Sequence, residues 1–236
     1  MGAVLESIAF DHAAFEVELA ALGALLGSKA DLSEKDDIQP LFRASKHLSA
    51  FLGTFAPDIG PATEMAFEFP FFGDYRADLL VGSKSACHFC VVEFEDGRAD
   101  SIFKKQPTRA NPEWSGRFEH DFSQLADWFF NLDDYKKSHG FTRTFGYGHI
   151  SFTGLLIIGR AAGMDDMKRT RLRWRSNKVL VDSNAVICVT FDDMYEVIKK
   201  RYALYKAGAP VEISQAAKPA ESAPPQPEKR DETGVK

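Results

Sequence analysis

The octapeptide CVVEFEDG, residues 90–97, joins an apolar run to closely spaced acids. In an extended strand successive side chains alternate between two faces, so Glu93 and Glu95 point the same way. Two neighbouring carboxylates repel, and burying them costs free energy unless a cation lies between them. Apolar side chains share the Glu93 face and also fill the opposite face, which is typical of a central strand. The stretch therefore predicts a central strand that carries an acidic site.

The rest of the chain predicts helices and strands in alternation around this strand. The expected elements are helices at 4–26 and 33–53, strands at 64–69, 75–81 and 87–95, a helix at 118–131, a strand at 152–158, a helix at 165–176, a strand at 186–189, and a last helix from about residue 192 to before residue 208. This order predicts the α/β class, with a mixed sheet flanked by helices in the order helix-strand-strand-strand-helix-strand and an extra N-terminal helix.

Length and composition limit what the chain can be. It has 236 residues with 20 Phe and a net charge of −5, which suits one domain with appendages and argues against a general nucleic-acid coat protein. No segment has the length and apolar character of a membrane span, and the N-terminus lacks the basic start of a secretory signal. Three cysteines form no disulfide framework, so the expected location is the cytoplasm.

One short segment reverses the acidic average. Residues 168–178, KRTRLRWRSNK, carry six Lys or Arg and no acid. A basic stripe on an acidic body can bind phosphate locally, because salt screens more distant charges. The alternative is a solvated helix face. The residues expected to contact a nucleic-acid backbone are Arg169, Arg171, Arg173, Arg175 and Lys178.

A zinc site is the less favoured interpretation of Cys87-His88-Phe89-Cys90. The spacing fits half of a zinc knuckle, but positions 87 and 90 of a strand face opposite sides. The remaining cysteine, Cys188, stands alone in the sequence, so no second pair of ligands exists. Buried core cysteines are the preferred interpretation.

An acid inside the preceding strand gives Glu93 a partner. Asp78 lies in RADLLV, residues 76–81, and falls on a strand that can pair with the strand of Glu93. Converging carboxylates with open coordination positions bind Mg²⁺ or Mn²⁺, which would relieve the repulsion between them. The alternative is an edge strand whose acids lie in water.

Several motifs in one order resemble a known family. An acid in one strand followed by an acid-x-(Lys or variant) motif resembles the PD-(D/E)xK nuclease superfamily. The surrounding sequence resembles the C-terminal nuclease domain of the Shedu anti-phage defence proteins over residues 33–203. The segments that carry this resemblance are RADLLV, CVVEFEDG, SGRFEHDFSQLADWF, GLLIIGRAAGMDDMKRTRLRW and VICVTFDDMYEVI.

The resemblance implies a restriction-endonuclease-like domain at 31–206 that cleaves DNA with Mg²⁺ or Mn²⁺. Asp78 and Glu93 match the metal-binding acids, and Gln124 matches a glutamine beside the site. Glu95 stands where many members have lysine, and would act as general base or as a third metal ligand. Lys104 or Lys105 would then supply a cation from the following loop.

The flanking segments and a rival function complete the prediction. A helix within residues 1–30 is a candidate for homo-oligomer formation, and residues 207–236 are expected to form a disordered tail, because they are rich in Pro, Ala and charge. The rival function is a catalytically inactive domain that keeps the nuclease fold and binds DNA or a partner protein. The lysine missing at position 95 favours that alternative.

Overall fold

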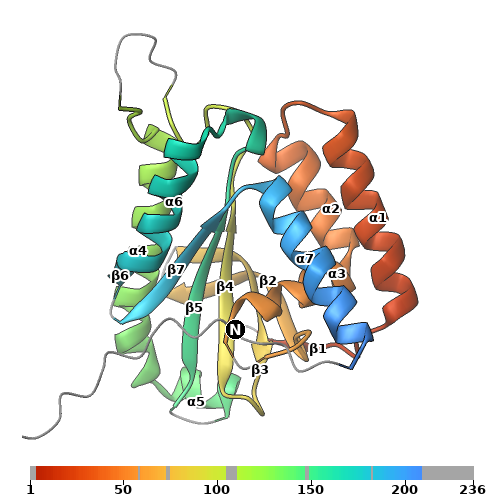
Figure 1. The fold of residues 1–236 in the computed structure, drawn as a ribbon. Coiled ribbons are helices and arrows are strands. Elements are labelled where there is room, and N and C mark those ends of the chain that lie inside the picture. The colour runs from red at the N-terminus through yellow and green to blue at the C-terminus, as the bar shows by residue number, and fades with distance from the viewer. Residues whose placement is uncertain are drawn as a thin grey trace, which may run out of the picture.

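The protein is described by a computed structural model that covers residues 4–57, 59–72, 75–104, 111–146, 149–181 and 183–208 (Figure 1). The helices are α1 (His12–Ser28), α2 (Gln39–Ala44), α3 (Lys46–Phe51), α4 (Gly116–Lys136), α5 (His139–Phe145), α6 (Asp166–Lys178) and α7 (Phe191–Lys206). The strands are β1 (Glu6–Ser7), β2 (Glu64–Phe72), β3 (Tyr75–Ser83), β4 (His88–Phe94), β5 (Ser151–Ile157), β6 (Leu180–Val181) and β7 (Asn184–Val189). From residue 209 onward, the expected tail lies outside the described residues.

The strands form one mixed sheet in the order β1-β2-β3-β4-β5-β7-β6. The first three pairings are antiparallel, β4 pairs parallel with β5 and β5 with β7, and β6 returns antiparallel to β7. Tight turns can join only antiparallel neighbours, whereas α4 and α5 connect β4 to β5 and make the parallel pairing possible. The mixed α/β class is confirmed.

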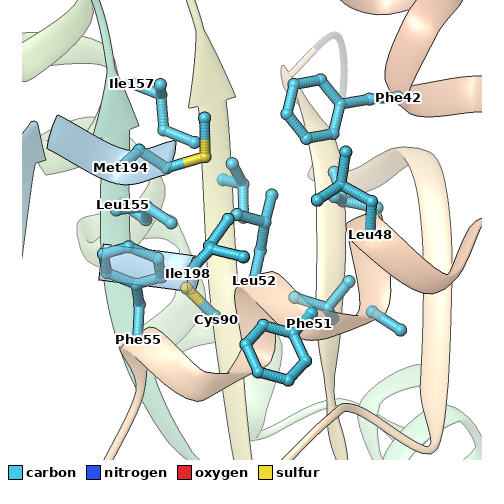
Figure 2. Packing of buried hydrophobic residues seen from close by; sticks show 14 of the residues in the cluster. Phe42, Leu48, Phe51, Leu52, Phe55, Cys90, Leu155, Ile157, Met194 and Ile198 are labelled. Carbon is cyan, nitrogen blue, oxygen red and sulfur yellow. The ribbon is translucent and has the colours of Figure 1, made fainter. Parts of the chain in front are cut away.

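Helices cover both faces of the sheet, and β4 is buried between them. Helices α1, α2, α3 and α7 lie on one side, and α4 and α6 on the other (Figure 1). Cys90, Val92 and Phe94 of β4 belong to the first hydrophobic cluster, part of which, including Cys90, is shown in Figure 2, whereas Phe89 and Val91 belong to the second. The prediction that this strand is central and apolar on both faces is confirmed.

The N-terminal half differs from the expected helices. The helix expected from residue 4 begins at His12, because the Asp11 side chain caps it by accepting from the Ala14 amide at 3.0 Å. Residues ahead of this cap pair with β2 as the short strand β1. The helix expected at 33–53 is divided into a π-helical turn (Glu34–Ile38), α2, α3 and a 3-10 turn (Leu52–Phe55). Pro40 lies in the first turn of α2, where its missing amide donor costs nothing.

Three short elements had no counterpart in the sequence prediction. They are α5, the 3-10 turn Ala161–Gly163, and the strand β6. Elements this short carry little periodicity, so their sequences do not distinguish them from loops. Among the described residues, no helix is both long and apolar enough to cross a membrane.

Candidate active site

The predicted acids meet where β3 and β4 stop pairing. Leu79 pairs with Val92, and continuing this antiparallel register by one residue sets Asp78 opposite Glu93. The Asp78 carboxylate replaces the next rung of the ladder, since its Oδ2 accepts from the Phe94 amide at 2.9 Å. Its Oδ1 accepts from Gln39 Nε2 at 3.1 Å. Burial raises the pKa of Asp78 to about 6, although the Phe94 amide opposes that change.

Glu93 is the most enclosed acid of this pair. Only 9% of it is exposed, and Gln124 Nε2 of α4 donates to its Oε1 at 3.2 Å. Its second oxygen, Oε2, has no hydrogen-bond partner among the described residues. Burial first, and then the charges of Asp78, Asp121 and Glu34, raise the pKa of Glu93 well above its usual value. The structure therefore brings together three of the predicted site residues, Asp78, Glu93 and Gln124.

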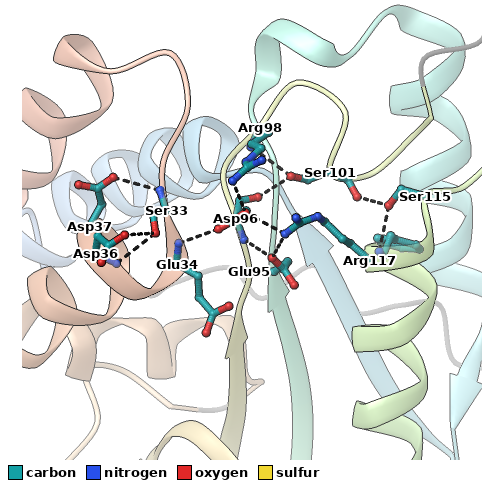
Figure 3. Close-up of polar contacts among 11 residues, drawn as sticks. Ser33, Glu34, Asp36, Asp37, Glu95, Asp96, Arg98, Ser101, Ser115 and Arg117 are labelled. Atoms are coloured by element: carbon teal, nitrogen blue, oxygen red, sulfur yellow. Dashed lines mark hydrogen bonds and ion pairs between the residues drawn. The ribbon is translucent and has the colours of Figure 1, made fainter.

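Glu95 lies just beyond the strand and has a cationic partner. Strand β4 ends at Phe94, and Glu95 Oε1 accepts from Arg117 Nη1 at 2.9 Å and from the Asp96 amide at 2.7 Å (Figure 3). The same Arg117 nitrogen lies 2.8 Å from Asp96 Oδ2. Burial would lower the pKa of Arg117, but the bond to Glu95 and the two acidic charges raise it. The cation beside Glu95 is therefore Arg117, which the sequence interpretation missed.

Glu34 joins the acids from the opposite side of the sheet. Its amide donates to Asp96 Oδ1 at 2.9 Å (Figure 3), and its Oε1 accepts from Gln39 Nε2 at 2.8 Å. Burial and the neighbouring charges of Asp78, Glu95 and Asp96 raise the pKa of Glu34 to about 7. Because Gln39 Nε2 donates to both Glu34 and Asp78, it links the π-helical turn Glu34–Ile38 to β3. Nothing in the local sequence around Glu34 distinguishes it from an exposed helix acid.

Asp121 completes the acidic group from α4. Ser115 caps this helix by accepting from the Phe118 amide at 3.0 Å, so Arg117, Asp121 and Gln124 follow along one stripe of its surface. Asp121 is 4% exposed, and its Oδ2 has no partner among the described residues. Burial, the charge of Glu95 and a hydrogen bond to Glu95 raise the pKa of Asp121 to about 8. Its position inside an apolar helical stripe was a usable sequence signal.

The acids of the site can be compared with what a divalent cation requires. Glu93 Oε2 and Asp121 Oδ2 are buried and unpaired among the described residues, and burial raises the pKa of Asp78 and of Asp121 more than the nearby cations Arg43 and Arg117 lower them. Within the described part of the chain, no group of three or more His, Cys, Asp or Glu is placed to hold a metal ion. Mg²⁺, however, is commonly held by one or two carboxylates, with water and substrate phosphate as its other ligands. Asp78 and Glu93 are the two carboxylates that the sequence predicts for this role, and their assignment as metal ligands stays a prediction.

Three of the five predicted basic residues of α6 make contacts inside the protein. Arg169 Nη1 lies 3.0 Å from Asp193 Oδ2, and Arg175 binds both oxygens of Glu119 at 2.7 and 2.8 Å. Arg171 donates to a backbone carbonyl and lies over two aromatic rings. Contacts inside the protein therefore account for much of the basic composition of α6.

The other predicted cations have different surroundings. Arg173 and Lys178 are exposed on α6. Lys104 is also exposed and its Nζ lies 3.7 Å from Glu113 Oε2, while Lys105 lies outside the described residues.

Two of the three cysteines match the preferred interpretation of buried core residues, whereas Cys87 lies in the turn before β4 rather than on the strand. All three are free; Cys90 and Cys188 are buried, and Cys87 is partly exposed. Burial raises the pKa of the Cys188 thiol to about 12 and that of Cys90 still further, so both are neutral thiols at physiological pH.

Comparison with known proteins identifies one family. The family described as Shedu protein SduA, C-terminal, matches residues 31–195. This range contains all the acids of the site, together with Arg117, Gln124 and α6. A search of curated proteins found no match to this chain.

Proposed function

Because the chain belongs to the family of the Shedu protein SduA, C-terminal, whose role is in anti-phage defence, we propose that it is a metal-dependent nuclease that hydrolyses phosphodiester bonds of DNA. We further propose that residues 31–206 form a restriction-endonuclease-like domain around the mixed sheet. The observation that carries the proposal is the buried carboxylate of Glu93, whose Oε2 has no hydrogen-bond partner among the described residues. Glu93 lies opposite Asp78 at the end of a central strand.

Asp78 and Glu93 would hold Mg²⁺ or Mn²⁺ in this enzyme. The bound ion would polarise a phosphate oxygen and lower the pKa of a water molecule. Gln124 keeps the Glu93 carboxylate oriented through its hydrogen bond to Oε1, and Gln39 does the same for Asp78. These amides leave Glu93 Oε2 available for a ligand.

Arg117 and Glu95 would together replace the lysine that many superfamily members have at position 95. Arg117 lies in the first turn of α4 with its side chain 47% exposed, so it can reach a phosphate oxygen while its ion pair with Glu95 orients it. An arginine cannot act as a base, because it stays protonated in proteins. Glu95 therefore remains the residue that would take a proton from the attacking water or serve as a further ligand.

A cleavage assay on purified protein tests the proposal. Supercoiled and linear DNA should be cut in Mg²⁺ or Mn²⁺, and Asp78→Asn or Glu93→Gln should abolish cutting, since each removes a metal ligand. Asp127→Asn, an exposed acid on α4, is the matched control and should retain activity. Arg117→Ala should lower kcat by about 10²–10³-fold, the cost of losing one donor that stabilises transition-state charge.

Thermal stability gives a readout that does not depend on turnover. Added Mg²⁺ should stabilise the wild-type fold by about 2.7 kcal/mol at about 100 times Kd, and the Glu93→Gln protein should show no such shift. Stabilisation without cleavage would assign the chain to the rival class, an inactive domain that binds DNA or a partner. If both ions leave stability and DNA unchanged, the metal site and the nuclease activity are refuted together.

A further inference from the structure

The outer face of α6 carries an aromatic side chain between cations. Leu172 is the buried residue of this helix, and Trp174 lies on the opposite face with 62% of its surface exposed. Lys178 follows one turn later on the same face, and Arg173, the residue before Trp174 in the helix, is also exposed. Met167, two turns earlier, is 49% exposed and extends the apolar strip.

Trp174 is the exposed one of the three tryptophans. Trp128 is 1% exposed, and Trp114 is stacked between Phe103 and Phe118 with ring centroids 4.4 and 4.7 Å away. An exposed indole offers a large flat apolar face with a polar N–H at its edge, which suits contact with a ligand. The ligand must suit an aromatic face and positive charge together.

Of the five cations predicted to bind phosphate on α6, two have side chains that make no ion pair, hydrogen bond or ring contact with the described residues and are available to a ligand. Arg171 lies over the rings of Phe103 and Trp114, and Arg175 is held by Glu119. Arg173 and Lys178 are exposed and make no ion pair with the described residues. The chain as a whole carries a net charge of −5, so this local excess of positive charge selects an anionic ligand.

The same helix is joined directly to the candidate active site. The Arg175–Glu119 pair fastens α6 to the first turn of α4, the turn that presents Arg117 beside Glu95. Figure 1 shows α6 next to α4 on one side of the sheet. A nucleic-acid strand that lies along α6 would therefore be next to α4, the helix that carries Arg117.

We propose that Trp174, Arg173 and Lys178 form a platform for an unpaired nucleic-acid strand. A base stacks on the indole of Trp174, and the two cations bind the adjacent phosphates. Bases inside a duplex are stacked on one another and cannot offer a face to the indole, so the ligand is a single strand or a frayed end. The inference rests on the proposed function for its premise that DNA is the substrate, and it adds the strand state that the enzyme prefers.

Binding without metal separates this inference from catalysis. The probes are a fluorescent oligothymidine of about ten nucleotides, within the range covered by one stacking platform, and a duplex of the same length. In EDTA, Trp174→Ala should weaken binding of the single strand by about 5-fold to 100-fold, and binding of the duplex by less than about 2-fold. Phe130→Ala removes an aromatic side chain that is 76% exposed on α4, and as matched control should change neither affinity.

Two further measurements test the mode of contact. Stacking should quench the emission of the exposed indole, and Trp174→Phe should remove that quenching while keeping most of the affinity. Arg173→Ala and Lys178→Ala should each flatten the salt dependence of single-strand binding by about 0.7 in slope, the value for one phosphate contact. Lys200→Ala, an exposed lysine on α7, should leave the slope unchanged.

Each outcome decides for or against the platform. Selective loss of single-strand affinity in Trp174→Ala supports it, even if the wild-type protein cuts no DNA and the nuclease proposal fails. Equal loss for both probes, or no loss for either, refutes it, even if the cleavage assay succeeds. If Trp174→Ala changes only the sedimentation coefficient of the protein, the patch is a contact between copies of the chain, and the inference is wrong.

Discussion

Glu34, Asp78, Glu93 and Asp121 come from four different elements, yet the pKa of each is raised above its usual value. Burial is the largest cause of every one of their raised pKa values, and repulsion from nearby carboxylates, including Glu68, Glu95 and Asp96, adds to it. The folded protein therefore keeps protons on this group at a pH where the unfolded chain has released them. Native acids in ion pairs behave in the opposite way.

The pH dependence of stability should reflect this cluster. For an acid with a raised pKa, the free energy of unfolding falls as pH rises from the unfolded to the folded value, here from about 3.8 to about 6 for Asp78 and to about 8 for Asp121. In EDTA, urea denaturation should therefore give an unfolding free energy lower at pH 8 than at pH 5 by more than about 2 kcal/mol.

A neutral isostere isolates the contribution of one acid. Asp121→Asn should flatten the decline between pH 5 and pH 8, because the group that would have been deprotonated is gone. Asp127→Asn, on the exposed side of the same helix, should leave the decline as it is. A wild-type stability that rises steadily from pH 5 to pH 8 would contradict the burial of unbalanced charge at this site.

Among the elements, α1, β5 and α7 are held together by one guanidinium. Arg160 follows β5, and its Nε and Nη2 bind the two oxygens of Asp192, each at 3.0 Å, in the first turn of α7. Its Nη2 also donates to the Leu26 carbonyl at the end of α1, at 2.8 Å. Burial would raise the pKa of Asp192, but the bonds from Arg160 and the Ala161 amide hold it below its usual value. The planar guanidinium therefore binds the end of α1 and the start of α7 at the same time.

Removing this fork should loosen the helical layer on that side of the sheet. Arg160→Ala should lower the free energy of unfolding by about 3–5 kcal/mol, since it leaves Asp192 charged and partly buried without its partner. Arg160→Lys should lose about 1–3 kcal/mol, because an ammonium cannot replace a planar bidentate donor. The control is Arg43→Lys in the exposed pair with Glu68, expected within about 0.5 kcal/mol in urea denaturation. Equal effects at both positions would show that Arg160 is only a surface ion pair.

At the scale of the whole molecule, α1 belongs to the same core as the sheet although the family match begins after it. Phe15, Leu22 and Leu26 are buried in the first hydrophobic cluster, together with side chains of α3 and α7. Each such side chain contributes about 1.5–3 kcal/mol when fully buried, so the three together contribute about 5–9 kcal/mol. That sum is comparable with the total stability of an ordinary domain, about 5–15 kcal/mol.

Two truncations should therefore have opposite outcomes. Deleting residues 1–30 should abolish cooperative thermal unfolding, because it exposes the cluster that α1 covers. Deleting residues 209–236, which lie outside the described residues and whose composition offers little to bury, should change Tm by less than about 2 °C. A folded, cooperative protein lacking residues 1–30 would show that α1 is a separate appendage.

Local pattern was enough to predict the framework of the site. The apolar alternation around Glu93 identified a central strand, and the position of Asp78 in the preceding strand identified its neighbour. The helical stripe that begins at Phe118 identified α4, which carries Gln124. In each case the pattern lies within a single strand or helix, so the spacing of apolar residues along the sequence is enough to predict it.

Tertiary structure alone decided which further side chains join the site. The Glu34 amide binds an acid 62 residues away, and Arg117 lies 22 residues from Glu95 in the sequence, so no local period connects these partners. The basic run of α6 looked like a uniform phosphate-binding stripe, but packing against α4 and α7 neutralised Arg175 and Arg169 and left Arg173 and Lys178 in water. The sequence determined which face of each element is apolar, because burial repeats with the period of the backbone. Pairing of charges depends on which elements touch, and only the assembled fold determines that.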